Sequence, residues 1–404
     1  MFSMVLRIRY LFQALALCFL AWSVWIFYGY FFDKDLPQVD LFGLDEFGYY
    51  CNDIHCTLIG KDGYKVSNVS VWLDEKPLVK NFKINRKEFE YEIPIDTAKI
   101  EDGKHTLRIE AENGTFSKNK STVVRDFYVD NVALQAAFVK PASEYKILQG
   151  RTLHLQFQVN KAIKSATVKI ASNSYNCFGE APGSNIFEAY IPIKAEEKPN
   201  EYPLSVEIID RVGNKFVLEG KFQVVAAGFK KQSLHIDPKK VKYEKEQGRR
   251  QSELEQELAL LFPKSPKIKL WQGTFYTPME YTSIATEFGV QRITPEKGCY
   301  AHNAIDLLAM PRSVIWSPQD GVVVIKDRYE ESGNTVVIDH GLGVFTLLFH
   351  LEEFADINVG DRLKRGNPIG KMGKTGYASG YHLHWELQIN GVKVDPFQWT
   401  KDGF

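Results

Sequence analysis

The sequence predicts a mainly β protein with one membrane helix at its N-terminus, and three observations support this prediction. Residues 10–32 contain no charged side chain, so the start of the chain is apolar enough to lie in a lipid bilayer. Runs rich in Thr, Val and Ile then alternate with turn residues at intervals of roughly 8 to 12 positions. Five of the nine histidines follow residue 300. The predicted segments are a tip and helix over 1–37, β-domains over 38–131 and 132–228, a linker with a helix over 229–270, and a C-terminal β-domain over 271–404.

The apolar N-terminal segment is predicted to be an uncleaved signal anchor. As a helix, residues 10–32 would rise about 35 Å, against about 30 Å for the hydrocarbon core of a bilayer. The segment ends in aromatic residues up to Phe32, which suits the membrane interface, whereas a cleaved signal peptide ends in small residues. Arg7 and Arg9 precede the segment and favour a cytoplasmic N-terminus. The sequence therefore predicts a single-pass inner-membrane protein whose bulk is periplasmic.

Charge and cysteine usage restrict the possible partners and compartments. The 50 basic residues balance the 50 acidic residues, and this balance argues against a nucleic-acid-binding protein. Cys51 and Cys56 are predicted to form a small disulfide loop in an oxidising compartment. A metal site that combines them with His55 is the alternative, but it would be incomplete. Cys177 is predicted to be a lone buried thiol.

The two β-domains read as diverged repeats. Both contain an "IPI" step, a polar turn with Asn and Gly, and a closing strand with an aromatic residue followed by Val. Regularly spaced short strands predict β-sandwiches, and both segments resemble immunoglobulin-like domains. Neither segment clusters titratable groups, so we expect a spacer or a docking module. A regulatory protein partner that binds through these repeats is a further expectation.

The linker over 229–270 is predicted to contain one helix. Asp237 can cap it, Pro238 can occupy its first position, and Pro263 ends it. Leu254, Leu258 and Leu261 form a thin apolar stripe among charged residues. We therefore expect a solvated connecting helix.

The last third of the chain carries the pattern of a metal site. In "GYHLHWE", His382 and His384 are two residues apart, so on a strand both imidazoles point to one face. Asp306 follows His302 by four residues, which is two full pleats of extended chain. A His, an Asp and one His of the pair supply N, O and N ligands. Three protein ligands leave a position for water, which is the arrangement of a catalytic zinc.

Residues 271–399 resemble the lysostaphin/LytM-type zinc endopeptidases that cut peptidoglycan peptides. The resemblance rests on "LWQGTFYTPM", "HNAIDLL", "GNTVVIDHGLGVFTLLFHL" and "GKMGKTGYASGYHLHWELQINGVKVDP", which appear in order over about 130 residues. It implies an antiparallel β-fold with a groove floored by one Zn²⁺, and peptidoglycan peptide as the substrate. The stretch from Gly370 to Gly380 is then expected to be a groove loop.

The resemblance assigns roles to five residues. His302, Asp306 and His384 match the metal ligands of the family. His382 and His350 match its two catalytic imidazoles, which would stabilise the oxyanion and transfer protons. Glu386 lies on the same strand face as His384. It is expected either to orient the imidazole of this ligand or to form a surface salt bridge.

Departures from the family pattern and competing candidates concern other positions. Ala304 stands where the family usually has Gly, Leu348 where it often has Tyr, and Tyr381 where Pro is frequent. None of these removes a ligand, so they bear on rate and substrate preference. His340 is expected to form a hydrogen bond with the backbone and not to bind metal. Cys299 could reach the metal and would then block the open position.

The expected function is that of a membrane-anchored zinc metalloendopeptidase that hydrolyses peptide cross-links of bacterial peptidoglycan. The alternative is a non-catalytic peptidoglycan-binding or amidase-activating protein on the same fold. A third possibility, an adhesion or scaffold protein built on the β-repeats, predicts that metal is dispensable. The sequence leaves the cleaved bond open between a D-alanyl cross-link, a glycine bridge and a peptide outside the wall.

Overall fold

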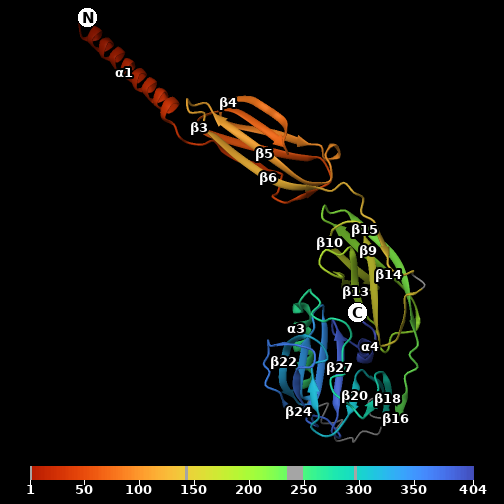
Figure 1. The fold of residues 1–404 in the computed structure, drawn as a ribbon. Helices are drawn as coiled ribbons and strands as arrows, with labels where there is room; N and C mark the ends of the chain where they lie inside the picture. Colours follow the sequence, from red (N-terminus) through yellow and green to blue (C-terminus); the bar gives the residue numbers. More distant parts are fainter. Residues whose placement is uncertain (1, 142–143, 234–248, 295–297) are drawn as a thin grey trace. The chain divides into compact units, whose positions relative to one another are not determined.

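A computed structural model describes residues 2–141, 144–233, 249–294 and 298–404. By its contacts the chain groups into two compact units, residues 1–133 with 211–214, and residues 134–210 with 215–404 (Figure 1). The fold is mainly β, as predicted. The finer division into five segments stays a prediction.

The first unit begins with a long apolar helix, α1 (Phe2–Phe32). Its stretch from Arg9 to Phe32 is 24 residues long and apolar enough to cross a membrane. The helix satisfies its own backbone hydrogen bonds, which a segment in a bilayer must do. The structure is therefore consistent with the predicted anchor.

The rest of the first unit is one six-stranded sheet and not the predicted pair of sheets. Its elements are β1 (Gln38–Phe42), β2 (Tyr49–Tyr50), β3 (Ile54–Leu73), β4 (Lys76–Ile95), a short helix (Thr97–Lys99), β5 (Gly103–Asn113) and β6 (Lys120–Val129). β3 and β4 are each 20 residues long and shift register at several points, so β3 can pair with β1, β4 and β5. Such shifts bend and twist strands. The prediction missed them because separate short strands and one bent strand have the same alternation.

The predicted disulfide between Cys51 and Cys56 is wrong, because both are free thiols. Cys56 lies in β3, where alternation directs it into the core beside Ile54 and Leu58. Burial raises the pKa of the Cys56 thiol to about 11. Cys177 is free and only half-buried.

The second β-domain is a sandwich of two sheets, as predicted. One sheet has the order β11-β10-β14-β15-β8 and the other β12-β13-β9-β7. The strands are β7 (Ala136–Phe138), β8 (Lys146–Leu148), β9 (Thr152–Val159), β10 (Ile163–Ile170), β11 (Asn173–Asn176), β12 (Phe178–Gly179), β13 (Ile186–Pro192), β14 (Asn200–Asp210) and β15 (Lys215–Val225). Buried side chains from both sheets form one core.

The C-terminal domain contains a three-stranded sheet and a ten-stranded sheet. The strands are β16 (Lys231–Ser233), β17 (Ser283–Thr286), β18 (Val290–Thr294), β19 (Gly298–His302), β20 (Ile305–Leu308), β21 (Val314–Trp316), β22 (Gly321–Tyr329), β23 (Gly333–Asp339), β24 (Val344–Phe354), β25 (Arg362–Leu363), β26 (Pro368–Met372), β27 (Leu383–Ile389) and β28 (Val392–Val394). In the larger sheet every pairing is antiparallel. The helices are α3 (Arg249–Leu261), a short turn (Phe262–Lys264) and α4 (Pro396–Lys401).

The predicted linker takes part in this domain. β16 pairs in parallel with β18 and extends the small sheet. Leu254 and Leu258 of α3 are buried against Tyr329, Phe345 and other residues of the large sheet. The helix therefore differs from the predicted solvated connector. Asp237 and Pro238, the predicted start of the helix, lie outside the described residues.

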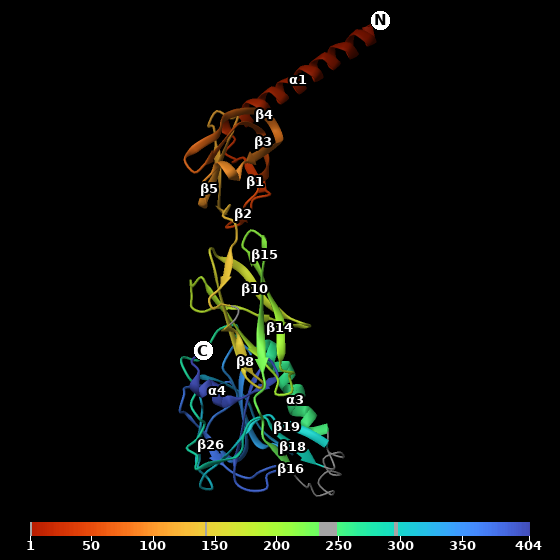
Figure 2. The ribbon, with the colours of Figure 1, turned by 90° about the vertical axis from the view of Figure 1, so that its right-hand side faces the viewer.

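The second β-domain and the C-terminal domain share a core. Tyr190 of β13 contacts Trp271 and Trp399, with ring centroids 5.5 and 5.7 Å apart. Gln398 of α4 accepts a hydrogen bond from the Thr152 amide at 2.7 Å and donates to the Thr152 carbonyl at 3.0 Å. Figures 1 and 2 both show α4 against the end of the sandwich. These contacts explain why the two domains group as one unit.

We expect Gln398→Ala to destabilise this second unit. The substitution leaves the buried backbone N–H and C=O of Thr152 without their hydrogen-bond partner. Each unsatisfied group lowers the free energy of unfolding by about 1–3 kcal/mol. Thermal unfolding of the full-length protein should show a lower midpoint, while Gln223→Ala on the exposed face of β15 should leave it unchanged. Equal midpoints for both variants would contradict a shared core.

Candidate metal centre

Three side chains from three strands converge on one point. His302 ends β19, Asp306 lies in β20 and His384 lies in β27. Asp306 and His384 are direct partners across the β20–β27 pair. One potential ligand atom from each of the three residues lies within 4.8 Å of the others. The structure thus brings together all three predicted ligands.

The route by which His302 and Asp306 meet differs from the predicted one. They are not on one extended segment, because β19 ends at His302 and β20 starts at Ile305. Asn303 and the fully buried Ala304 join the two strands. The strands belong to different sheets, so the site lies where the small sheet meets the large one.

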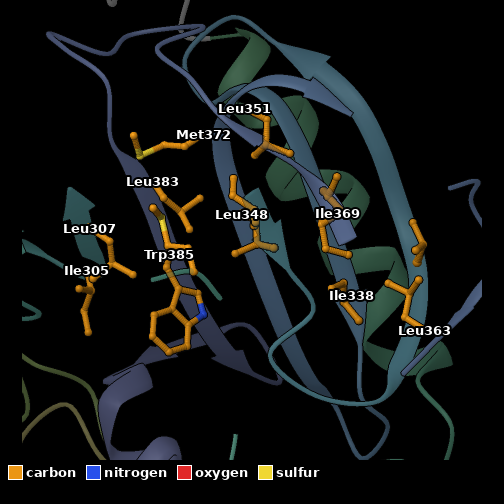
Figure 3. Packing of buried hydrophobic residues seen from close by; sticks show 14 of the residues in the cluster. Ile305, Leu307, Ile338, Leu348, Leu351, Leu363, Ile369, Met372, Leu383 and Trp385 are labelled. Carbon is orange, nitrogen blue, oxygen red and sulfur yellow. The ribbon is translucent and has the colours of Figure 1, made fainter. Parts of the chain in front are cut away.

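The alternation of β20 and β27 separates the site from the core. Figure 3 shows Ile305 and Leu307 of β20 packed beside Leu383 and Trp385 of β27. The intervening residues Asp306 and His384 therefore point to the opposite face. This apolar layer fixes both strands beneath the ligands, since a slip of one residue would bury the ligands and expose the core.

The electrostatics around Asp306 favour a carboxylate. Its oxygens lie 3.2 Å from His302 Nε2, 2.9 Å from His384 Nδ1 and 3.5 Å from Arg292 Nη2. Burial by itself would raise the pKa of Asp306, but the hydrogen bonds with His302 and His384 outweigh burial and hold the pKa well below its usual range. Burial lowers the pKa of His302 and favours its neutral form. An ionised carboxylate and a neutral imidazole are the forms that bind metal.

The donor set fits a metal ion of the zinc type. Two imidazole nitrogens and a carboxylate oxygen are among the ligands that Zn²⁺ takes, and three protein ligands leave a position open. Cys299 is not part of the group; it is exposed, and its thiol contacts Gln291 at 3.6 Å. Among the described residues, then, no thiolate closes the open position.

Glu386 orients the imidazole of His384. Its Oε1 lies 3.1 Å from His384 Nε2, and it also accepts from Lys393 and Gln388, each at 2.8 Å. Without metal, Nδ1–H can donate to Asp306; donation of Nε2–H to Glu386 would leave the Nδ1 lone pair free for a metal ion in its place. Glu386 is only 3% exposed, so the expected alternative of a surface salt bridge is wrong.

Glu386→Gln is expected to weaken metal binding without unfolding the domain. Loss of a carboxylate that fixes a ligand imidazole typically lowers metal affinity about 10- to 100-fold. Competition with a zinc-binding dye measures this affinity independently of activity. Glu352→Gln is the matched control, because Glu352 lies in β24 and is part-exposed. Equal zinc affinities for the two variants would refute the orienting role.

His350 reaches the site through a bulge in β24. Two residues, Phe349 and His350, oppose the single Thr335 of β23, and His350 has φ of +64°. Leu348 and Leu351 on either side both face the core (Figure 3). Strict alternation would have directed His350 into the core with Leu348, whereas the bulge places it on the side of Phe349. Left-handed backbone at a non-glycine residue is costly, and such strain concentrates at functional sites.

His350 and His382 present equivalent atoms to the centre. His350 Nδ1 lies 2.8 Å from the Thr375 carbonyl, and His382 Nδ1 lies 2.9 Å from the Gly380 carbonyl. A carbonyl only accepts, so each Nδ1 carries the proton and each Nε2 is left for the site. The rings are 4.8 Å apart. Burial, followed by the neighbouring His382 and His384, lowers the pKa of His350 to about 4, so it is neutral at pH 7.

The centre lies in a cavity of about 1370 Å³. Helix α3 contributes Leu254, Glu255 and Leu258 to its wall, and the loop before β27 contributes Tyr377 and Tyr381. Tyr377, Ser379 and Gly380 of the expected groove loop line the cavity, whereas residues 370–372 belong to β26. The sequence did not predict that α3 lines this cavity, because its charged sequence does not show which of its faces packs against the large sheet.

Two further residues near the centre were not found from sequence. Arg292 of β18 lies beside Asp306, and the Thr375 carbonyl holds His350. Thr375 lies in the quoted stretch from Gly370 to Gly380, but its sequence does not show that its carbonyl would hold His350, and strand pairing brings Arg292 beside Asp306. His340, by contrast, has the expected structural role: it is fully buried and bonded to the Asp320 carbonyl and the Thr346 hydroxyl.

Comparison with known proteins identifies relatives of this part of the chain. Residues 300–396 match the model of Peptidase family M23. A Vibrio cholerae protein named peptidoglycan DD-endopeptidase ShyC is 33% identical over 121 residues, which is 30% of this chain and 28% of that protein. DD-carboxypeptidase/endopeptidase Mpg of Neisseria meningitidis is 36% identical over 119 residues, or 30% of this chain and 27% of that protein.

These matches cover under a third of each relative's own length. Among solved structures, a peptidase M23 from Pseudomonas aeruginosa aligns over 63% of this chain and 94% of its own, at 23% identity and a TM-score of 0.45. The family match over residues 300–396 lies in the C-terminal domain and includes His302, Asp306 and His384.

Proposed function

We propose that this chain, which carries a peptidase M23 domain at its C-terminus, is a membrane-anchored zinc metalloendopeptidase that cuts peptide cross-links in peptidoglycan. The observation that carries the proposal is the convergence of His302, Asp306 and His384 with the imidazoles of His350 and His382 in one cavity. Three ligands with an open position already suit a catalytic metal, and the two imidazoles add groups that can move protons. The set of five suits hydrolysis of an amide bond.

The chain's own residues supply positioning and proton transfer. Zn²⁺ bound by His302, Asp306 and His384 would supply a Lewis acid for the scissile carbonyl and acidify a water molecule. His350 is neutral and its Nδ1–H is committed to Thr375, so its Nε2 can accept a proton. His382 offers its Nε2 in the same way. Either imidazole, once protonated, can donate to the oxyanion or to the leaving amine.

The substrate follows from the relatives and the site. The matched proteins carry the names DD-endopeptidase and DD-carboxypeptidase/endopeptidase. A bond between D-alanine and a diamino acid in the cross-link is the bond we propose. The cavity of about 1370 Å³ is large enough to admit a peptide.

The anchor and the β-domains define where the enzyme would act. The apolar helix from Arg9 to Phe32 would hold the chain in the inner membrane, with the N-terminus cytoplasmic and the catalytic domain periplasmic. A regulatory protein that binds the first β-domain is part of the proposal. The second β-domain is less suited to a movable cover, because it shares a core with the C-terminal domain.

A non-catalytic wall-binding or amidase-activating protein on this fold is the weaker alternative. Such a protein does not need a complete ligand set, whereas here all three ligands and both imidazoles are present and hydrogen-bonded. A scaffold protein that acts only through its β-repeats would not need them either.

Digestion of purified peptidoglycan tests the proposal. The full-length protein is loaded with zinc, incubated with peptidoglycan, and the soluble fragments are identified by mass spectrometry. We expect fragments that end at a peptide bond and that disappear after chelation. Absence of fragments from a zinc-loaded, folded protein would overturn the enzymatic proposal in favour of the binding protein.

A further inference from the structure

The end of helix α1 is attached to the turn between β5 and β6. The Phe116 amide donates to the Tyr30 carbonyl at 2.8 Å, and the rings of Phe116 and Phe31 are 5.2 Å apart. Tyr64, on a bulged part of β3, lies 6.1 Å from Tyr30 between ring centroids. The first β-domain thus touches the last turn of the helix through aromatic side chains.

Two asparagines fasten the chain that leaves the helix. Asn113 donates to the Asp35 carbonyl at 3.2 Å, and Asn119 donates to the carbonyls of Asp33 and Asp35 at 3.1 and 3.2 Å. Asn113 is fully buried, and its side-chain oxygen Oδ1 accepts hydrogen bonds from Thr115 and Asn119 within the turn. The turn and the helix end are therefore joined by polar bonds as well as by ring contacts.

The tip of this turn exposes an aromatic residue next to other apolar residues. Phe116 is 65% exposed although it contacts Phe31. Tyr28, Phe31 and Phe32 are exposed on the helix end itself. A single exposed apolar residue needs no explanation. Here the exposed ring is continuous with a helix that carries no charged side chain from residue 10 to residue 32, and this continuity indicates a shared environment.

The length of the helix sets the depth of the turn. An apolar helix from residue 10 to residue 32 is about 35 Å long and exceeds a hydrocarbon core of about 30 Å. Its last turn, with Tyr30 and Phe31, therefore lies among the lipid headgroups, where aromatic side chains are enriched. A group in contact with Tyr30 and Phe31 must lie at a similar depth.

We propose that the β5–β6 turn, with Phe116 at its tip, inserts into the headgroup layer of the membrane that α1 spans. The proposal rests on the membrane anchor of the proposed function. Lys65 and Lys118 fit this placement: Gly114 of the turn donates to the Lys65 carbonyl at 2.8 Å, and Lys118 is exposed within the turn. Such side chains can reach lipid phosphates while their methylene stems stay in apolar surroundings.

Insertion gives the first β-domain a function that the cavity does not explain. The domain would stand directly on the bilayer, with a second contact besides the helix. The helix end and the turn would then resist rotation of this domain about the helix axis, because two separated points are held at the membrane surface.

Photocrosslinking to lipid tests the proposal in the full-length protein. The chain is reconstituted into lipid nanodiscs with p-benzoylphenylalanine at position 116, 47 or 28, and lipid adducts are measured by mass spectrometry after irradiation. Phe47 is the matched control, since it is 55% exposed and lies away from the turn. Its amide donates a hydrogen bond to the Asp126 carbonyl near the other end of β6. From Lys120 to Asp126 the strand rises about 20 Å. Tyr28 reports on the helix alone.

We expect lipid adducts at positions 28 and 116 and only background at 47. Adducts at 28 without adducts at 116 would overturn the proposal and leave the anchor intact. Adducts at all three positions would also overturn it, because the contact would then not belong to the turn. Absence of adducts at 28 would show that the premise of an anchor has failed, and the proposal would fall with it.

Discussion

Replacing His384 with alanine should remove zinc from the protein and reduce peptidoglycan hydrolysis by about 1,000-fold or more. A metal ion contributes several kcal/mol of transition-state stabilisation, and each 1.36 kcal/mol corresponds to a factor of ten in rate. His384 is also the partner of both Asp306 and Glu386, so its loss removes a proposed ligand and the link between two buried carboxylates. Zinc content, measured by mass spectrometry of the purified protein, should fall together with activity.

The matched control for this prediction is His55→Ala, since His55 is an exposed histidine of β3 in the other unit. It should keep full activity and full zinc content. Thermal unfolding of both variants excludes collapse of the domain as the cause of a loss. If His384→Ala binds zinc as the unsubstituted protein does, or hydrolyses peptidoglycan at a comparable rate, the assigned ligand set is refuted.

Replacing His350 should separate chemistry from metal binding. His350→Asn and His350→Ala should each lower kcat about 100-fold or more, the usual contribution of a positioned acid or base, while zinc content stays unchanged. Asparagine tolerates the left-handed conformation that His350 adopts at φ of +64°, so His350→Asn should fold as well as the unsubstituted protein.

The pair of variants makes this second prediction decisive. His350→Ala forces a methyl-bearing residue into the same strained backbone, so a difference in unfolding midpoint between the two reports the cost of the bulge. Equal loss of activity with different stability would place the effect in the imidazole. Activity within a few-fold of the unsubstituted enzyme in His350→Asn would contradict a catalytic role, and loss of zinc would make His350 part of the metal site.

The sequence determined the parts of this protein that depend on local pattern. An uncharged run of 23 residues predicted the helix from residue 10 to residue 32, because its length alone matches a bilayer. The spacing of histidines and an aspartate predicted a metal site with His302, Asp306 and one histidine of the His382/His384 pair, and the family resemblance then selected His384. The chain order of these residues also carried the resemblance to the peptidase family.

Other features were decided by tertiary structure, because they depend on which segments pair. The first β-domain forms a single sheet since β3 bends and pairs with three strands, and alternation within one strand does not reveal this. Cys56 points into that core, so the spacing of two cysteines did not predict their state. α3 packs on the large sheet through leucines, although its charged sequence had predicted a solvent-exposed helix.

The position of His350 shows the same limit at the site itself. The family resemblance identified His350 as a catalytic residue, but regular strand alternation would have placed its side chain in the core beside Leu348. An extra residue opposite Thr335 reverses its direction, and that residue is visible only once β23 and β24 are paired. Residue identity therefore determined which side chains could do the chemistry. Strand pairing over long sequence separations decided how they meet, because register and bulges depend on both partners of a pair.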